Sequence, residues 1–441
     1  MEKFRENIAV RRERAILVGA LFKNTYADNL AELAALAESV GAIIVDKLQQ
    51  KVTRIHPATY IGSGKADMIR QRAKKNKAEV IIFDNDLSPG QIRKLEEIIE
   101  VKVIDRSELI LDIFASRAQT KQAKLQVDLA QLEYTYPRLT QMWSHLDTVT
   151  GAAGGTVAGA VGGIGTRGTG EKQLEIDRRI VSKRIIELKR ELADIDSRKM
   201  REIETRKGMF KICLVGYTNA GKSTLLNALT DAGVYVADRL FATLDTRTRQ
   251  WAIEGGQKVL LSDTVGFIRN LPHQLVASFK ATLEEAINAD LLLHIVDVSS
   301  NDAEGQAENA KKVLDEIGCK GKNILVLLNK ADIVKNQSQL ELLGTIYPDA
   351  ICISARTRMN LDVLKEKVLE IYAGGEVILR VTASAADGRI QNFLKANATV
   401  LQQQFTDSTV VVDVRLGKNR LPELERFRPE KIEQIDADEK F

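Results

Sequence analysis

The sequence predicts a multidomain α/β protein, and three observations along its 441 residues carry this prediction. Short apolar runs alternate with helical patterns in two separate stretches, which is typical of parallel sheets covered by helices. Two other segments repeat apolar residues at spacings of four and three, which indicates two long helices that pack together. Between these two segments lie nine of the 29 glycines, all from Gly151 to Gly170.

The composition is that of a globular chain with little excess charge. Lys and Arg total 64, Asp and Glu total 60, and 44% of the residues are hydrophobic. The net charge of +4 excludes a strongly basic nucleic-acid tail and a highly charged disordered protein. The three cysteines are too scattered for a disulfide framework or a CxxC metal site: Cys213, Cys319 and Cys352.

Four domains are expected in chain order, with boundaries where the sequence pattern changes. An N-terminal α/β domain is followed by an antiparallel helical hairpin, a second α/β domain and a small α+β domain. Their expected bounds are 1–110, 111–206, 207–373 and 374–441. The last of them should hold strands near 377–381 and 408–416, with a helix over 389–405 between them.

The hairpin is expected from two apolar stripes on otherwise polar helices, with the glycine-rich segment at its tip. Helix connections usually take about 2–8 residues, so this longer segment calls for an explanation. The stripes are Leu125, Leu129, Leu132, Tyr136 and Leu139 on the first helix, and Val181, Ile185, Leu188, Leu192 and Ile195 on the second.

A phosphate-binding loop is expected at the start of the second α/β domain. The pattern GxxxxGK[ST] follows the apolar run KICLV and precedes a helical pattern, which is the required strand-loop-helix context. Its backbone N–H groups and the helix N-terminus would hold phosphates, while its lysine reaches the β- and γ-phosphates and its serine a Mg²⁺ ion. The residues are Gly216, Tyr217, Thr218, Asn219, Ala220, Gly221, Lys222, Ser223 and the following Thr224.

A second phosphate-side element, DTVG, follows at the end of the apolar strand KVLLS. Asp263 at that strand end is placed to hold Mg²⁺, and the Gly266 N–H to contact the γ-phosphate. Thr264 and Val265 lie between them and complete the element.

The sequence NKAD after the strand ILVLL predicts recognition of guanine. The Asp332 carboxylate would accept two N–H bonds from the base, which adenine does not offer, and such a site rejects the wrong base by on the order of 10⁴. Asn329 would brace the loop, and the stem of Lys330 would pack on the base. A second base-contacting loop follows the strand AICI, with Ser354, Ala355 and Arg356.

These elements, in this order, resemble the translation-factor-like P-loop GTPases. The resemblance implies a P-loop GTPase domain with a mostly parallel sheet, GTP as the substrate and Mg²⁺ as the cofactor. The stretch FATLD resembles that of one subgroup and implies that Thr243 ligates Mg²⁺ and senses the γ-phosphate. Thr246 and Thr248 are competing candidates for this role.

The residue that follows DTVG is Phe267, where many GTPases have a glutamine that orients the attacking water. An apolar side chain cannot do this. The sequence therefore predicts slow hydrolysis by the protein alone and completion of the site by a partner.

Several stretches outside the nucleotide motifs resemble the HflX family of ribosome-associated GTPases, over roughly residues 10 to 375. They include HPATYIGSGK at 56–65, GGIGTRG at 162–168, GEKQLE at 170–175 and DRR at 177–179. The resemblance implies binding to the RNA and proteins of the large ribosomal subunit and splitting of stalled or idle ribosomes, with GTP governing release. Departures from the family pattern occur at Thr169, Lys172, Thr246 and the additional segment 149–161.

Several alternatives stay open at the level of sequence. The chain could be a GTP-dependent RNA-binding factor in large-subunit assembly without splitting activity; a small-molecule P-loop kinase is disfavoured by the guanine loops. The glycine-rich tip, whose one charge is Arg167, is either a flexible linker or a surface that fits RNA by shape. GSGK at 62–65 either starts a helix or contacts a second purine nucleotide.

The cellular setting is expected to be the cytoplasm, with peripheral association at a membrane as an alternative. No apolar run reaches the roughly 20 residues of a membrane span. Nothing in the residues indicates a stable oligomer, so a monomer is expected.

Overall fold

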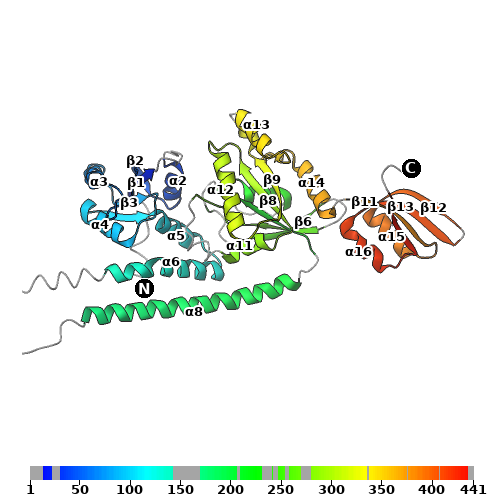
Figure 1. Cartoon of the computed structure of the whole chain (residues 1–441), viewed down its shortest axis with the longest axis horizontal. Helices are drawn as coiled ribbons and strands as arrows, with labels where there is room; N and C mark the ends of the chain where they lie inside the picture. The colour runs from blue at the N-terminus through cyan, green and yellow to red at the C-terminus, as the bar shows by residue number, and fades with distance from the viewer. Residues whose placement is uncertain are drawn as a thin grey trace, which may run out of the picture.

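The computed structural model describes residues 13–21, 30–142, 169–205, 209–230, 241, 247–253, 258–269, 280–334, 337–374, 376–406 and 408–435. These residues form three sheets and a pair of long helices (Figure 1). Thr243 and the glycine-rich segment up to residue 168 lie outside the described residues.

The N-terminal unit, which runs from β1 to α5, is a parallel sheet with the strand order β2-β1-β3-β4. Successive side chains of β1 enter opposite cores: Leu17 packs in the core with α2 and α5, and Ile16 in the core with α3 and α4. Both faces of the sheet are therefore covered by helices. The elements are β1 (Arg14–Leu21), α2 (Ala31–Ser39), β2 (Ile43–Lys51), α3 (Ser63–Asn76), β3 (Val80–Phe83), α4 (Pro89–Ile99), β4 (Lys102–Asp105) and α5 (Arg106–Arg117).

The two long helices are α6 (Lys121–Met142) and α8 (Thr169–Thr205), which lie side by side (Figure 1). Seven of the ten predicted stripe residues, from both helices, form one apolar cluster between them. That cluster contains Leu125, Leu129, Leu132, Ile185, Leu188, Leu192 and Ile195. An ion pair of 2.8 Å between Lys189 and Glu133 borders it.

Helix α6 is also fixed to the N-terminal unit. The Tyr134 hydroxyl donates to Asp105 at 2.5 Å, and Arg138 pairs with Asp105 at 3.0 Å and with Glu108 at 3.2 Å. The guanidinium of Arg138 stacks over the ring of Tyr134. The hairpin is therefore held at a defined angle to the first sheet by contacts that are largely buried.

The central unit, from β5 to α14, is the mostly parallel sheet that the sequence predicts, in the order β10-β9-β8-β5-β7-β6. The exception is β6, which pairs antiparallel with β7. The elements are β5 (Lys211–Gly216), α9 (Lys222–Thr230), β6 (Arg247–Ala252), β7 (Lys258–Asp263), α11 (Lys280–Ile287), β8 (Leu291–Asp297), α12 (Ala303–Glu316), β9 (Asn323–Asn329), α13 (Gln337–Ile346), β10 (Ile351–Cys352) and α14 (Leu361–Ala373).

The C-terminal unit is an antiparallel sheet in the order β12-β13-β11-β14, with α15 and α16 packed on its core. The expected helix over 389–405 is wrong in its second half, because α15 ends at Asn397 and 398–405 form a strand. Hydrogen bonds to β13 pair the backbone N–H and C=O groups of this segment. Pairing with a neighbouring strand thus outweighs a weak local preference for helix. The elements are β11 (Glu376–Ser384), α15 (Gly388–Asn397), β12 (Ala398–Phe405), β13 (Thr409–Gly417), α16 (Leu421–Arg426) and β14 (Lys431–Gln434).

Within the described ranges, none of the helices combines the length and the apolar character needed to cross a membrane.

Candidate nucleotide site

The glycine-rich loop GYTNAGKS joins the end of β5 to the start of α9, as the motif requires. Two of its glycines have positive φ and no space for a side chain. A Cβ on Gly216 (φ 145°) would lie 2.3 Å from the Ile295 carbonyl oxygen, and one on Gly221 (φ 98°) would lie 2.3 Å from the Asn329 amide. Only glycine fits at either position, so the loop shape is set by close backbone approach.

Lys222 lies at the first position of α9 with its ammonium group folded along the loop. Its Nζ donates to the carbonyl oxygens of Tyr217 at 2.7 Å and Gly216 at 3.1 Å. Burial lowers the pKa of Lys222 to about 8, against the opposing attraction of Asp263. A buried ammonium group in this position favours an anion beside it.

Ser223 and Asp263 meet on the other side of the loop, where the Ser223 hydroxyl donates to the carboxylate at 2.6 Å. Hydroxyl and carboxylate oxygens are the ligand types that Mg²⁺ prefers, so these two residues fit that ion. Thr224 follows in α9, and Thr243 lies outside the described residues. Among the described residues, no group of three or more His, Cys, Asp or Glu side chains could hold a metal by itself.

The remaining side chains of DTVG point into the protein. Thr264 donates its hydroxyl to the Leu214 carbonyl at 2.7 Å, and Val265 is buried in the core that includes α2 and α5. Any ligand contact from these two residues would therefore come from their backbone.

The predicted base-side loops lie together. The Asn329 amide donates to the Ala220 carbonyl at 2.7 Å and accepts from the Ala355 N–H at 3.0 Å, so one side chain joins the two loops to the phosphate loop. Ser354 lies beside Ala355 and accepts the Thr357 N–H at 3.1 Å. The bracing role predicted for Asn329 matches these contacts.

Lys330 and Asp332 take different positions at this edge. Lys330 has a positive φ of 65° and its ammonium group pairs with Asp297 at 2.6 Å. Asp332 is exposed in the short turn after β9, and Arg356 is exposed in the turn after β10. Asp297 was not singled out from the sequence; its signal is its place at the C-terminal end of β8, beside the end of β9.

The segment after Asp263 folds back onto the phosphate loop. The Phe267 N–H donates to the Gly216 carbonyl at 3.0 Å, and the Thr218 N–H donates to the Phe267 carbonyl at 2.7 Å. The Phe267 side chain is buried in a core cluster with Tyr217 and α12. An aromatic side chain held there is not available to orient a water molecule.

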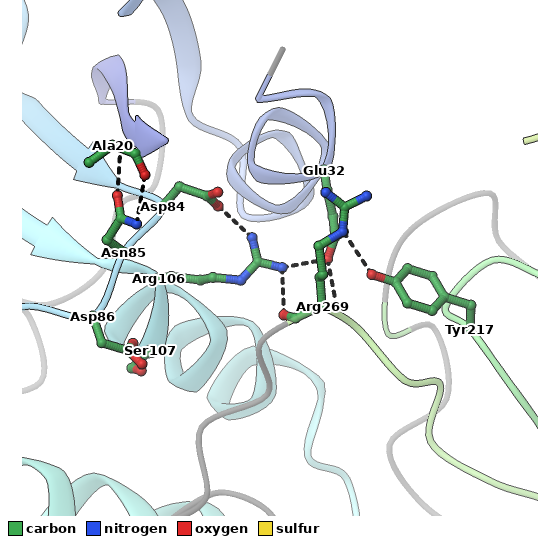
Figure 2. Close-up of polar contacts among 9 residues, drawn as sticks. All are labelled: Ala20, Glu32, Asp84, Asn85, Asp86, Arg106, Ser107, Tyr217 and Arg269. Atoms are coloured by element: carbon green, nitrogen blue, oxygen red, sulfur yellow. Dashed lines mark hydrogen bonds and ion pairs between the residues drawn. The ribbon is translucent and has the colours of Figure 1, made fainter. Parts of the chain in front are cut away.

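The N-terminal unit reaches this same segment, which sequence reasoning did not anticipate. Glu32 on α2 accepts the Tyr217 hydroxyl at 2.7 Å and the Arg269 N–H at 3.1 Å, and it also pairs with Arg106 (Figure 2). Arg106 pairs with Asp84 at 2.6 Å as well. No sequence motif marks these residues, because they come from parts of the chain far apart.

The GSGK segment of the N-terminal unit begins helix α3. Gly62 is the residue before the helix and has no side chain for capping, and α3 starts at Ser63. Burial, with a smaller contribution from Arg72, lowers the pKa of Lys65.

Three family models match consecutive parts of the chain. The model for the GTP-binding GTPase N-terminal region matches residues 27–115, and that for the GTP-binding GTPase middle region matches 117–206. The model for the 50S ribosome-binding GTPase matches residues 211–330. The GTPase HflX of Lacrimispora saccharolytica is 42% identical, covering 87% of this chain and 88% of that protein.

The chain belongs to the HflX family of GTPases. The HflX protein of Escherichia coli is 37% identical, over 92% of this chain and 93% of the relative. A solved GTP-binding protein from Sulfolobus solfataricus in complex with GDP is 26% identical, covers 82% of this chain and has a TM-score of 0.42. Like other HflX proteins, this chain is a P-loop GTPase that binds and hydrolyses GTP.

Proposed function

We propose that the two sides of the nucleotide site divide the recognition of GTP. On the base side, Asp332 accepts the guanine N–H groups, while Asn329 holds the loops together. On the phosphate side, the loop N–H groups and Lys222 hold the phosphates, and the Gly266 N–H contacts the γ-phosphate. This proposal is supported by the Asn329 hydrogen bonds and by the buried position of the Lys222 ammonium group.

Mg²⁺ fits beside the phosphates. Ser223 and Asp263, which already meet at 2.6 Å, would hold it together with Thr243. When bound, the ion would supply positive charge that neutralises the phosphates. The chain itself contributes the Ser223 hydroxyl, the Asp263 carboxylate and the phosphate loop, in which Gly216 and Gly221 leave no space for a side chain.

We propose that this chain binds the large ribosomal subunit and splits stalled or idle ribosomes. The observation that carries the proposal is the hairpin of α6 and α8, which is fixed to the same N-terminal unit that contacts the nucleotide site. Helix α8 has 37 residues, so at about 1.5 Å per residue it is about 55 Å long. In this proposal, a helix of that length transmits a conformational change at the nucleotide site to a distant contact on the large ribosomal subunit.

The surface of α8 supports contact with RNA. Arg178, Arg179 and Lys183 are exposed in its described part. Contacts to RNA phosphates make affinity fall as salt concentration rises. Binding to the isolated large subunit should therefore weaken with salt, and a flat salt response would contradict phosphate contact by this helix.

Hydrolysis is expected to be slow until the ribosome binds. Phe267 replaces the usual glutamine, and its side chain is buried in the core cluster with Tyr217 and α12. A partner that completes such a site raises the rate by on the order of 10³–10⁵ where it supplies an arginine.

Sedimentation of intact ribosomes tests the proposal. Ribosomes are mixed with this chain and GTP, GDP or a non-hydrolysable GTP analogue, and we expect subunits to appear with GTP or the analogue. Lys222→Ala should abolish the nucleotide dependence. Intact ribosomes throughout, with the chain bound to free large subunits, would instead favour a role in subunit assembly.

A further inference from the structure

The segment after Asp263 contains Gly266, whose N–H the proposed function assigns to the γ-phosphate, and it packs on the phosphate loop. Two hydrogen bonds tie Phe267 to Gly216 and Thr218. A methyl group added to Gly266 would lie 2.7 Å from the Thr218 Cα and 2.8 Å from the Lys222 Nζ. Gly266 thus lies directly against the phosphate loop and the ammonium group of Lys222.

One carboxylate of the N-terminal unit holds the two parts of this closed arrangement together. One oxygen of Glu32 accepts the Tyr217 hydroxyl from the phosphate loop at 2.7 Å. The other oxygen accepts the Arg269 N–H, three residues beyond Gly266, at 3.1 Å. Figure 2 shows Glu32 on its helix beside Arg269, with the Tyr217 hydroxyl directed toward them.

Arg106 fixes Glu32 in turn. Its guanidinium group, 3% exposed, pairs with Glu32 and Asp84 and donates to the Arg269 carbonyl at 3.0 Å. The Arg269 side chain completes the cluster by pairing with Asp302 at 2.6 Å. Buried charges of this kind are costly to leave without a partner, so the cluster favours a single arrangement.

Apolar contacts act in the same direction. Val265 and Ile268, on either side of the Gly266–Phe267 pair, are buried in the core formed with α2 and α5. Phe241 joins this core, with its ring 4.6 Å from that of Phe114 in an edge-to-face contact. Val265, Ile268 and Arg269 of this segment are therefore held by the N-terminal unit.

We propose that Glu32 is a positioning residue that sets the preference of the site between GDP and GTP. By holding Tyr217 and Arg269 together, it stabilises the arrangement in which Gly266 and Phe267 exclude the γ-phosphate. For a ligand that fits only the open arrangement, the apparent affinity is the intrinsic affinity multiplied by the fraction of molecules that are open, whereas a ligand that fits both arrangements is unaffected. The inference rests on the proposed place of the γ-phosphate between Lys222 and Gly266.

Equilibrium binding to the purified full-length chain tests this role without ribosomes. The probes are GDP and a non-hydrolysable GTP analogue, measured for Glu32→Gln and Tyr217→Phe. Tyr217→Phe removes one hydrogen bond to the carboxylate, and Glu32→Gln removes the negative charge that Tyr217, Arg269 and Arg106 share. In each variant the affinity for the analogue should therefore rise roughly tenfold relative to the affinity for GDP. Glu38→Gln, at an exposed position on the same helix, is the matched control and should change neither affinity.

The contrary results are distinct. Unchanged affinity for the analogue in both variants, or an equal loss for GDP and the analogue, would overturn the selection role and leave Glu32 as a structural contact. If Glu32→Gln does not fold, Tyr217→Phe decides, because it keeps every partner of Arg106. Failure of ribosome splitting would not alter these binding results, and loss of the effect here would not alter sedimentation.

Discussion

The two sides of the nucleotide site differ in what holds them in place. On the base side, Asn329 joins its partners Ala220 and Ala355 within the central unit. On the phosphate side, Tyr217 and Arg269 are held by Glu32 of the N-terminal unit. The base side is thus organised by one unit alone, whereas the phosphate side is shared. A displacement of the N-terminal unit should therefore change the binding of the phosphates and leave the recognition of guanine unchanged.

The largest effect should come from the base side. Asp332→Ala removes the acceptor proposed for guanine, so the preference for GTP over ATP should fall by as much as about 10⁴. Competition of ATP and GTP against a fluorescent guanine nucleotide measures the ratio. Asp349→Ala, at another exposed aspartate of the same unit, should leave the ratio unchanged. An unchanged ratio in Asp332→Ala would mean that other groups recognise the base.

The next effect concerns the apolar contact between the units. Phe114→Ala removes a buried ring that packs on Phe241, and such changes lower the free energy of unfolding by about 3–5 kcal/mol. Denaturant unfolding measures the change, with Phe405→Ala as the control because Phe405 is 66% exposed. Equal stability of the Phe114→Ala and Phe405→Ala variants would show that the two units do not share this core.

A pH effect should appear on the phosphate side only. Burial places the pKa of Lys222 at about 8, and a bound phosphate favours its charged form. The complex then holds more protons than the free protein above this pH, so nucleotide affinity should fall as pH rises, by up to about tenfold per unit. Calorimetry in two buffers with different ionisation enthalpies measures the proton uptake. No proton uptake between about pH 8 and about pH 9.5, the range just above that pKa, would contradict the expectation.

The smallest effect should be that of salt on the discrimination between GDP and GTP. The Glu32 and Arg106 pair is buried, and buried pairs are screened much less than exposed ones. The ratio of the two affinities should change by less than about twofold when the salt concentration rises tenfold, although each affinity alone weakens. A steep change in the ratio would place the discrimination at exposed charges instead.

The sequence predicted most of the elements because each depends on local chemistry. The loop from Gly216 to Ser223 needs glycines wherever the backbone approaches other atoms closely, and those positions are readable as a motif. The hairpin was predicted from a spacing of apolar residues that is typical of helices packed along their length. The segment 398–405 was misread because its state depends on pairing with β13, a partner that local patterns do not reveal.

The shared phosphate side could not be predicted in this way. Glu32 reads as an ordinary acidic residue near the start of a helix, and Arg106 as an ordinary residue after a strand. Their partner Tyr217 lies 185 residues beyond Glu32 in the chain. The significance of each residue comes from a contact between units, and hydrogen bonds at such separations leave no periodic signal.

The sequence by itself therefore determined the family, the nucleotide, the order of the units and the presence of the hairpin. Each of these follows from residues close together in the chain, where spacing is the direct cause of the structure. Only the tertiary structure decided that the N-terminal unit contacts the segment after Asp263 through Glu32 and Arg106, and that Phe114 packs on Phe241. These contacts depend on burial. A carboxylate and a guanidinium group pair in one defined arrangement when packing removes both from water and brings their hydrogen-bond partners within reach.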